Sequence, residues 1–470
     1  MFKKMLEWLR RMFTGALGTA KDAALADVII SPKMEAAIDR WAREYEGRPP
    51  WADKDTKTIG LFASIAKEIA RLVTMEADIQ ITGGGRAEYL AQQLFPFLDA
   101  LAVYTELGAA LGGIVFKPFV SGDQIIIDAV QGDAFYPINF DTSGRMTGAV
   151  FVDQLRRHDA IYTRLERHDY SDGKHTVSNR AYSSSNQDSL GKQIALSDVP
   201  EWADIPDEMS FQAVDRPLFG YFRIPLANRI DRHSPLGVSV YADAEKLIRD
   251  VDEQYTRYLW EFTGGELAVY ASDDCLRPTQ TQDGPREMPK HQRRIIRGLP
   301  VRGQDFYKEF APQLRDESFK RGLNSILQRV EFSCGLAYGT LSDPQTVDKT
   351  AEEVRASKQR SYSTVKSIQA ALEAAIDDLV YAMDQLATVY RLAGSGAYEV
   401  AYDWDDSIVN DPKERKQMFW QYVTAGKYPM WKYLVEFEGY SEDEARELSD
   451  MPGLSDPFGF SEGGGGNASA

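Results

Sequence analysis

The sequence predicts an α+β protein in which helices and strands come in separate blocks. Between residues 113 and 182, apolar residues alternate with polar ones in six short runs joined by turn residues, which is typical of an antiparallel sheet. A second observation is a helical pattern that follows Thr350 and meets no Pro or Gly before Gly394. Roughly 42 helical residues would span ~63 Å, which exceeds the diameter of a small domain.

Composition narrows the class of protein. The chain has 470 residues, an apolar fraction of 43% and a formal net charge of -17. The apolar fraction is typical of a folded protein, and the acidic balance argues against a general nucleic-acid coat, which needs a basic surface. The two cysteines, Cys275 and Cys334, form no CxxC motif, which favours a reducing compartment.

Residues 1–26 are expected to form an amphipathic arm. Apolar side chains fall on one face of a predicted helix, opposite lysines and arginines: Met1, Phe2, Met5, Leu6, Leu9, Met12 and Phe13. Glu7, Arg10 and Arg11 interrupt any signal-peptide core. Such a helix is expected to dock on a partner or on its own domain, with membrane attachment as the less favoured alternative. No run of about 18 apolar residues exists, so no stable membrane association is expected.

The first block of helices begins at Ser31, an N-cap followed by Pro32. The spacing predicts helices over 32–45, about 57–73 and about 86–111, the last kinked at Pro96. The predicted strands of the sheet follow, at 113–120, 124–130, 135–140, 146–155, 160–170 and 175–182. The last two are separated by S-D-G-K, which indicates a hairpin.

Two further helices bracket an insertion. Helical spacing runs from Val238 to Phe262 and again over 316–336, and the 50 residues or so between them are short, mixed and rich in breakers. From residue 397 the chain is acidic with short predicted helices, one of them capped by Ser441 and Glu444. Residues 456–470 have the composition of a flexible tail.

A search for chemistry finds no P-loop, dinucleotide fingerprint, HExxH motif or nucleophile elbow. The pairs His158-Asp159 and His168-Asp169 flank one predicted strand and are interpreted as polar strand ends. Cys334 is interpreted as a small core residue. No catalytic residue, metal site or cofactor is therefore predicted, and the chain is not expected to be an enzyme.

Two charged features remain. The predicted insertion carries a basic patch that could meet an acidic partner or phosphates, or be a solvated loop: Arg286, Lys290, Arg293, Arg294 and Arg297. The long helix is basic early, at Arg355 and Lys358, and acidic later, at Asp377 and Asp378. Three carboxylates at Asp403, Asp405 and Asp406 form an alternative candidate, a divalent-metal site.

The order of elements, with three sequence strings, resembles the portal proteins of tailed bacteriophages, in the branch found in phages of Gram-positive hosts. Residues 107–120 resemble the first wing strand of that family, residues 219–241 its lead-in to the first stem helix, and residues 334–354 its tunnel loop entering the long helix. The resemblance covers about residues 32–448.

The resemblance implies a ring, usually a dodecamer, at one capsid vertex of the virion, assembled in the host bacterial cytoplasm. Double-stranded DNA would pass through its channel during packaging and ejection. The implied partners are the subunit itself, the terminase large subunit, head-tail adaptor proteins, and the major capsid and scaffold proteins.

The resemblance also divides the chain into the parts of a portal subunit. The implied ranges are a wing at 27–238, stem helices at 239–264 and 316–337, a small α/β clip at 265–315, a tunnel loop at 338–350, a long helix back through the wing at 351–396 and a short helical crown at 397–455. Leu341, Gln345 and Lys349 are candidates to face DNA.

These parts give the charges expected roles. DNA carries about one charge per 1.7 Å, so a largely acidic subunit favours sliding over tight binding. The basic patch would then serve as a motor or adaptor contact at the clip. The opposite charges of the long helix would meet between subunits, because a closed ring joins different faces of neighbouring copies. The alternative function is a metal-dependent nuclease or transferase that uses Asp403, Asp405 and Asp406.

Overall fold

A computed structural model describes residues 29–157, 160–185, 190–266, 268–272, 280–281, 284–285, 296–299, 307–310, 312–343, 351–404 and 412–449. The predicted N-terminal arm and C-terminal tail, His158-Asp159 and the predicted cap Thr350 lie outside these residues. The chain divides into two compact units, Met1–Trp404 and Asp405–Ala470.

From residue 29 on, the first described helices of the first unit are α2 (Pro32–Tyr45), α3 (Leu61–Thr74), α4 (Gly85–Asp99) and α5 (Leu101–Leu111). The predicted cap is confirmed, because the Ser31 side chain accepts a hydrogen bond from the Met34 amide. The bend predicted at Pro96 lies instead at Ala100, where α4 and α5 meet at 61°. Phe97 packs on Tyr104 and Phe116 there, so aromatic contacts hold the bend one turn beyond the proline.

Six strands form the largest sheet, in the order β4-β5-β6-β7-β8, with β9 paired to β7. Their bounds are β4 (Phe135–Phe140), β5 (Met146–Arg157), β6 (Ala160–Ser171), β7 (Lys174–Ser184), β8 (Lys192–Ile194) and β9 (Glu208–Gln212). The predicted hairpin joins β6 and β7, and both turn residues, Asp172 and Gly173, have positive φ. The six runs predicted as strands between residues 113 and 182 are all strands.

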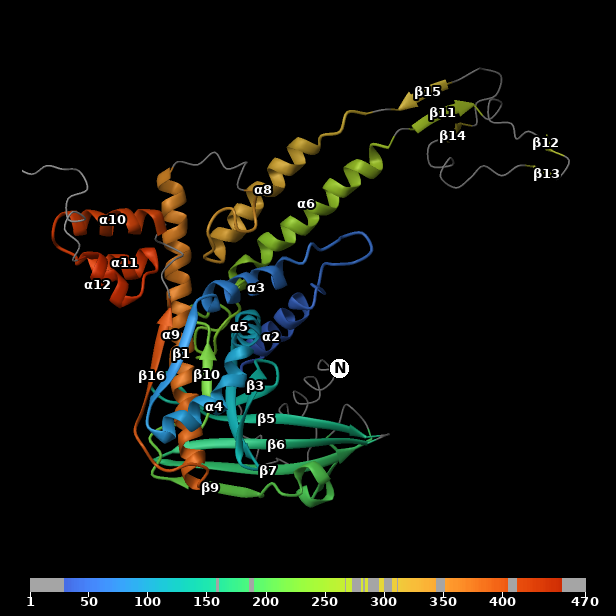
Figure 1. The fold of residues 1–470 in the computed structure, drawn as a ribbon. Coiled ribbons are helices and arrows are strands. Elements are labelled where there is room, and N and C mark those ends of the chain that lie inside the picture. The colour runs from blue at the N-terminus through green and yellow to red at the C-terminus, as the bar shows by residue number, and fades with distance from the viewer. Residues whose placement is uncertain are drawn as a thin grey trace, which may run out of the picture. The chain divides into compact units, whose positions relative to one another are not determined.

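A second, three-stranded antiparallel sheet has the order β10-β2-β3, formed by β10 (Gly220–Arg223), β2 (Gly113–Ser121) and β3 (Gln124–Gln131). The long helix α9 (Ala351–Val389) packs against β10 and β2, and also contacts α3 and α4 (Figure 1). A Cβ at Gly220 would lie 2.1 Å from the Ala375 carbonyl oxygen, so α9 reaches this close to the sheet because that position is glycine.

The two predicted stem helices are α6 (Glu245–Gly264) and α8 (Asp316–Ser333). They run antiparallel, since Glu261 bonds Arg315 while Tyr258 packs on Phe319 further along (Figure 1). The helix predicted from Val238 begins only at Glu245, after a short 3-10 turn, η3 (Ala242–Ala244). Tyr241 lies outside the helix, buried, and its hydroxyl donates to the Trp41 carbonyl at 3.0 Å.

Between α6 and α8, short strands form the predicted insertion. In one sheet β11 (Ala268–Ser272) pairs in parallel with β14 (Ile296–Leu299) and antiparallel with β15 (Tyr307–Phe310). In the other, β12 (Gln280–Thr281) pairs with β13 (Gly284–Pro285).

The C-terminal boundary of the first unit differs from the prediction. Helix α9 ends at Val389, and β16 (Tyr398–Trp404) then pairs antiparallel with β1 (Ala77–Gly83). The Tyr402 hydroxyl donates to Asp377 of α9 at 2.6 Å, which ties β16 to the long helix. Residues 398–404 therefore belong to the first unit, whereas the predicted crown began at residue 397.

The described part of the second unit, residues 412–449, holds three short helices: α10 (Pro412–Thr424), α11 (Met430–Glu438) and α12 (Glu442–Ser449). Phe419 packs on Tyr428 and Phe437, and Trp420 packs on Tyr433, which forms a small aromatic core. The predicted capping box is confirmed, because Ser441 and Glu444 exchange hydrogen bonds between side chain and backbone.

The helices of the described residues differ from membrane spans in length or composition when each is taken singly. The bent pair α4–α5 has both the length and the apolar composition of a span when its two helices are taken together.

Candidate functional site

Residues 334–343, which follow α8, form a turn that is held by many hydrogen bonds. At the end of α8 the Leu336 amide donates to the Glu331 carbonyl at 2.8 Å, and the Gly335 amide donates to the Phe332 carbonyl at 3.3 Å. This pair of bonds, with φ of +71° at Gly335, is a Schellman motif. It reverses the chain at once, so that the following residues fold back over the last turn of α8.

The Glu331 carboxylate holds the reversed chain. The side chain is fully buried and accepts hydrogen bonds from the amides of Gly339 at 3.1 Å, Leu341 at 2.6 Å and Ser342 at 2.8 Å. Its second oxygen accepts from the Ser342 hydroxyl at 3.0 Å. A buried carboxylate with this many donors fixes the backbone of the loop, because each amide would otherwise lose its hydrogen bond to water.

Both helices contribute further anchors to the turn. Asn324 of α8 accepts from the Asp343 amide at 2.7 Å, and Ser357 of α9 accepts from the Tyr338 amide at 2.7 Å. The Arg360 guanidinium of α9 lies over the rings of Phe332 and Tyr338, at 4.4 and 5.2 Å from their centroids. The turn is thus fixed to the two helices that it joins.

Glycine is required where the helices approach. A Cβ at Gly335 would lie 2.4 Å from the Thr364 hydroxyl of α9, and φ at this position is positive. Any larger residue would both strain the backbone and push α9 away from the end of α8.

The structure places one of the three predicted tunnel residues. Leu341 is half-buried in the anchored turn, with its amide bonded to Glu331. Gln345 and Lys349 lie outside the described residues. Glu331, Asn324, Ser357 and Arg360, which build the turn, were not predicted, because in the sequence they are ordinary polar positions of two amphipathic helices.

The helix pair α6–α8 and its flanks expose large apolar side chains. Trp260 is 65% exposed and Phe332 59%, with Phe262 and Leu314 also exposed. At the far end of the pair, Arg315 donates to Glu261 through its amide at 3.1 Å and its guanidinium at 3.0 and 2.6 Å. This hydrogen bonding from Arg315 lowers the pKa of Glu261. Exposed aromatic residues on a rigid helix pair are typical of a protein interface.

The charges predicted to join neighbouring subunits along the long helix occupy different environments. Lys358 is exposed, and the Arg355 side chain lies outside the described part of the chain. Asp377 accepts from Tyr402, as noted above. Asp378 is buried and forms ion pairs within its own chain, with Arg145 and, at 3.0 Å, with Arg216. Its charge therefore joins α9 to the sheet region, a role that the sequence did not indicate.

The structure describes only some residues of the remaining predicted sites. Of the basic patch, only the backbone of Arg297 is described, in β14; Arg286, Lys290, Arg293 and Arg294 lie outside. Asp403 stands opposite Asp78 in the β1–β16 pair, and Asp405 and Asp406 lie outside the described residues. Across the described chain, no group of three or more His, Cys, Asp or Glu side chains could hold a metal ion. Cys334 is buried, which raises the pKa of its thiol.

His168 is not a polar strand end, because it lies inside β6 in a buried polar network. Glu166 accepts from Lys117 at 2.6 Å and from the Arg164 guanidinium at 3.0 Å, and its other oxygen lies 2.7 Å from His168 Nε2. His168 Nδ1 lies 3.0 Å from Nε2 of His175. Alternation alone did not reveal this network, because its members come from three strands.

The surroundings of the network determine the protonation of its carboxylate and of its two imidazoles. Burial alone would raise the pKa of Glu166, but Lys117, His168 and Arg164 together hold it well below its usual range. Burial lowers the pKa of His168, and burial with the neighbouring ring lowers that of His175 to about 2. Glu166 is therefore ionised and His175 neutral at neutral pH.

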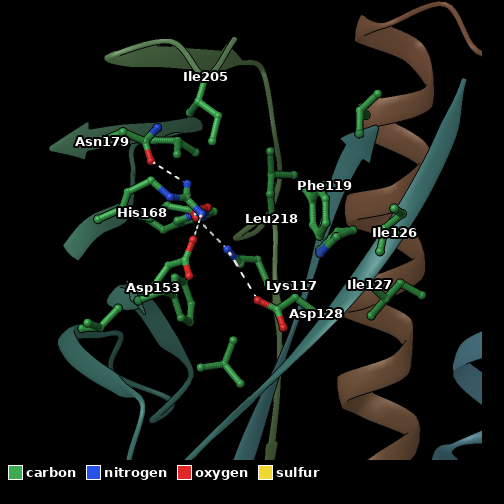
Figure 2. Close-up of a pocket in the computed structure, with 18 of the residues that line it drawn as sticks. Lys117, Phe119, Ile126, Ile127, Asp128, Asp153, His168, Asn179, Ile205 and Leu218 are labelled. Atoms are coloured by element: carbon green, nitrogen blue, oxygen red, sulfur yellow. Dashed lines mark hydrogen bonds and ion pairs between the residues drawn. The ribbon is translucent and has the colours of Figure 1, made fainter. Parts of the chain in front are cut away.

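Next to the network lies a cleft of about 1000 Å³ between the two sheets (Figure 2). Phe119 and Ile126 of the β2–β3 hairpin lie on one wall, whereas Asp153, His168 and Asn179 lie on the other. Leu386 and Tyr390, at the end of α9, complete the apolar side.

Comparison with known proteins gives little. No family model and no curated protein matches the chain. Among solved structures, a chain described as "Neck of native GTA particle computed with C12 symmetry" is 12% identical, with a TM-score of 0.40. The match covers 88% of this chain and 98% of that one. A TM-score of 0.40 does not establish a shared fold.

Proposed function

We propose that this chain is the subunit of a phage portal, a ring with a central channel that conducts double-stranded DNA and has no chemistry of its own. One observation carries the proposal: an antiparallel helix pair, α6 and α8, is followed by an anchored turn and then by the 39-residue helix α9, which packs against β10 and β2. This is the succession that the resemblance to portal proteins implies for stem, tunnel loop and long helix.

The anchored turn suits a channel lining. A loop beside moving DNA has to keep its position without binding the phosphates strongly. Glu331 fixes the backbone of residues 339–342 from beneath, so the turn needs no contact with DNA to stay ordered. The acidic balance of the chain, with a net charge of -17, disfavours tight binding of the phosphate backbone.

The exposed stem aromatics suit the ring contacts. In a closed heterologous ring, one face of each subunit packs on a different face of the next, and Trp260 and Phe332 would be buried there. Lys358 and Arg355 would add a charged part to that contact. We further propose that the ring is a dodecamer at a capsid vertex. The module between α6 and α8 would then contact the terminase motor and later the head-tail adaptors.

Assembly provides a direct test of this proposal. Reversing Arg355 and Lys358 to Glu is expected to lower the fraction of chain found in rings at moderate salt, as measured by mass photometry. Exchanging the exposed pair Lys174 of β7 and Lys192 of β8 for Glu is the matched control, and is expected to change assembly less. Equal assembly in both variants would contradict a role for the basic start of α9 in the ring.

A further inference from the structure

The cleft between the two sheets has the form of a groove for an amphipathic segment. On its apolar wall, Phe119 and Ile126 stand directly opposite each other across β2 and β3, and each is 42% exposed. Two large apolar side chains that are paired across neighbouring strands and exposed to solvent indicate a surface that another polypeptide segment covers. At about 1000 Å³, the cleft is at the upper end of the ~300–1000 Å³ typical of ligand pockets.

The cleft is also acidic. Its lining includes exposed or half-buried carboxylates at Asp128, Asp133, Asp153, Glu201 and Asp204. The cations in the lining, Lys117 and Arg164, bind Glu166 and also pair with Asp128 at 4.0 Å and with Asp153 at 3.4 Å, so the carboxylates of the lining still outnumber its cations. Burial raises the pKa of Asp128 and of Asp133, although Lys117 opposes the shift at Asp128. A basic apolar occupant would relieve both the exposed apolar surface and the excess negative charge.

The chain itself carries a segment of that chemistry. Residues 1–13, M-F-K-K-M-L-E-W-L-R-R-M-F, combine a predicted apolar face with Lys3, Lys4, Arg10 and Arg11, against one acid, Glu7. Recognition of such a segment by an apolar groove with acidic edges is a common mode of helix binding.

The point where the described chain begins makes the contact reachable. The Ile29 amide donates to the Pro137 carbonyl of β4 at 2.8 Å, and Asp133 and Ala134, just ahead of β4, line the cleft. Four strand residues span ~13 Å. Residues 14–28 can extend over ~50 Å at ~3.3 Å per residue, so they can carry residues 1–13 from Ile29 to the cleft with slack.

We propose that residues 1–13 bind in the cleft between the two sheets of their own chain, with the apolar face on Phe119 and Ile126 and the basic residues toward Asp128 and Asp204. Residues 1–13 would thereby cover the exposed apolar side chains of the cleft. The proposal does not depend on the portal function, and it would hold for a subunit of any other assembly.

Photo-cross-linking of the full-length protein tests the proposal. A benzoylphenylalanine at Leu9 is expected to cross-link to residues of the β2–β3 hairpin or to the end of α9, as identified by mass spectrometry. The same probe at Glu7, about 160° around the predicted helix from Leu9, reports the opposite face and is expected to give at most about a third of that yield. Cross-links from Leu9 to any other part of the chain, or none within it, would overturn the proposal.

Charge variants provide the second arm. Asp128→Lys with Asp204→Lys is expected to lower the Leu9 cross-link about fivefold or more, whereas the matched reversal of two exposed stem acids, Asp250→Lys with Glu317→Lys, leaves it unchanged. Equal losses in both pairs would argue against recognition by this cleft. Circular dichroism shows whether each variant is folded.

Isotope mixing separates the two possible sources of the arm. When subunits of ordinary and of ¹⁵N-labelled protein are assembled together, the proposal predicts cross-linked peptides in which both halves carry the same label. Peptides with mixed labels would show that the arm belongs to a neighbouring copy, and would overturn the assignment to its own chain. Deleting residues 2–13 gives an independent readout, an expected rise in deuterium uptake over residues 124–131, and unchanged uptake there would also contradict the proposal.

Discussion

The Glu331 carboxylate accepts a hydrogen bond from the Leu341 amide at 2.6 Å, just after the chain has reversed direction at the end of α8. The same carboxylate accepts the amides of Gly339 and Ser342, so one buried side chain fixes the loop from α8. The two helices α8 and α9 therefore determine where the loop lies, whereas Glu331 determines its backbone conformation.

Glu331→Gln tests this anchor. The amide keeps the size of the side chain, but it loses the charge and turns one acceptor into a donor that faces backbone amides. We expect a loss of about 1–3 kcal/mol in the free energy of unfolding, because buried donors are left without an acceptor. Hydrogen exchange should also rise at residues 339–342. Glu317→Gln, on the exposed first turn of α8, is the control and should change neither quantity.

Gly335→Ala tests the approach of the two helices. The methyl group would meet Thr364 and would place a non-glycine residue at a φ of +71°. We expect a loss of roughly 1–2 kcal/mol from the backbone strain alone. Combining the change with Thr364→Ala should restore the part that arises from the clash, and no recovery in the double variant would show that the contact with α9 does not matter.

Glu44 makes the stability of the first unit depend on pH. Burial, then repulsion by Glu245, raises its pKa to about 8, and neither of its carboxylate oxygens has a hydrogen-bond partner in the described chain. The folded protein holds a proton here that the unfolded chain releases near its ordinary pKa of 4.5. The contribution of this group to stability therefore falls as pH rises from about 4.5 to about 8.

Glu44→Gln should remove that dependence. Relative to the parent, the variant is expected to gain roughly 1–4 kcal/mol in unfolding free energy between about pH 5 and about pH 9, measured by urea titration. Glu46→Gln, on the exposed side of the same turn, is the matched control. Parallel pH profiles for the parent and the Glu44 variant would contradict a protonated buried carboxyl.

Trp260→Arg tests the stem as a subunit contact. The side chain is 65% exposed in one subunit, so the change should cost little in the stability of the subunit itself. In a ring, however, the guanidinium would be placed in an apolar contact, and we expect assembly to need at least about tenfold more protein. Val389→Arg, exposed at the end of α9, is the control. Loss of assembly in both variants alike would argue against a specific stem interface.

The sequence predicted the elements well where periodicity was long or regular. The strands between residues 113 and 182 alternate clearly, and α9 lacks any breaker, so local pattern and tertiary structure agree. By contrast, β1 and β16 are seven residues each and are separated by more than three hundred, so the pairing of Asp78 with Asp403 has no local signal. That missed pair also explains why the predicted crown began too early.

The position of the turn after α8 could be predicted from the sequence, but its construction could not. The string from Cys334 to Val354 indicated a functional turn, yet Glu331 looks like one more polar residue of an amphipathic helix. Its role exists only because Gly335 folds the chain back over it. Asp378 was interpreted as a surface charge for the same reason, since Arg145 and Arg216 reach it from distant parts of the chain.

The most direct test of the central claim is electron microscopy of the purified full-length protein, with two-dimensional class averages of the particles. A portal subunit is expected to form closed rings with a central channel wide enough for double-stranded DNA, and rotational averaging should give a single symmetry, dodecameric in the finer proposal. Compact monomers or rings without a channel, at protein concentrations where the Trp260 and Phe332 surfaces would be buried, would contradict the account.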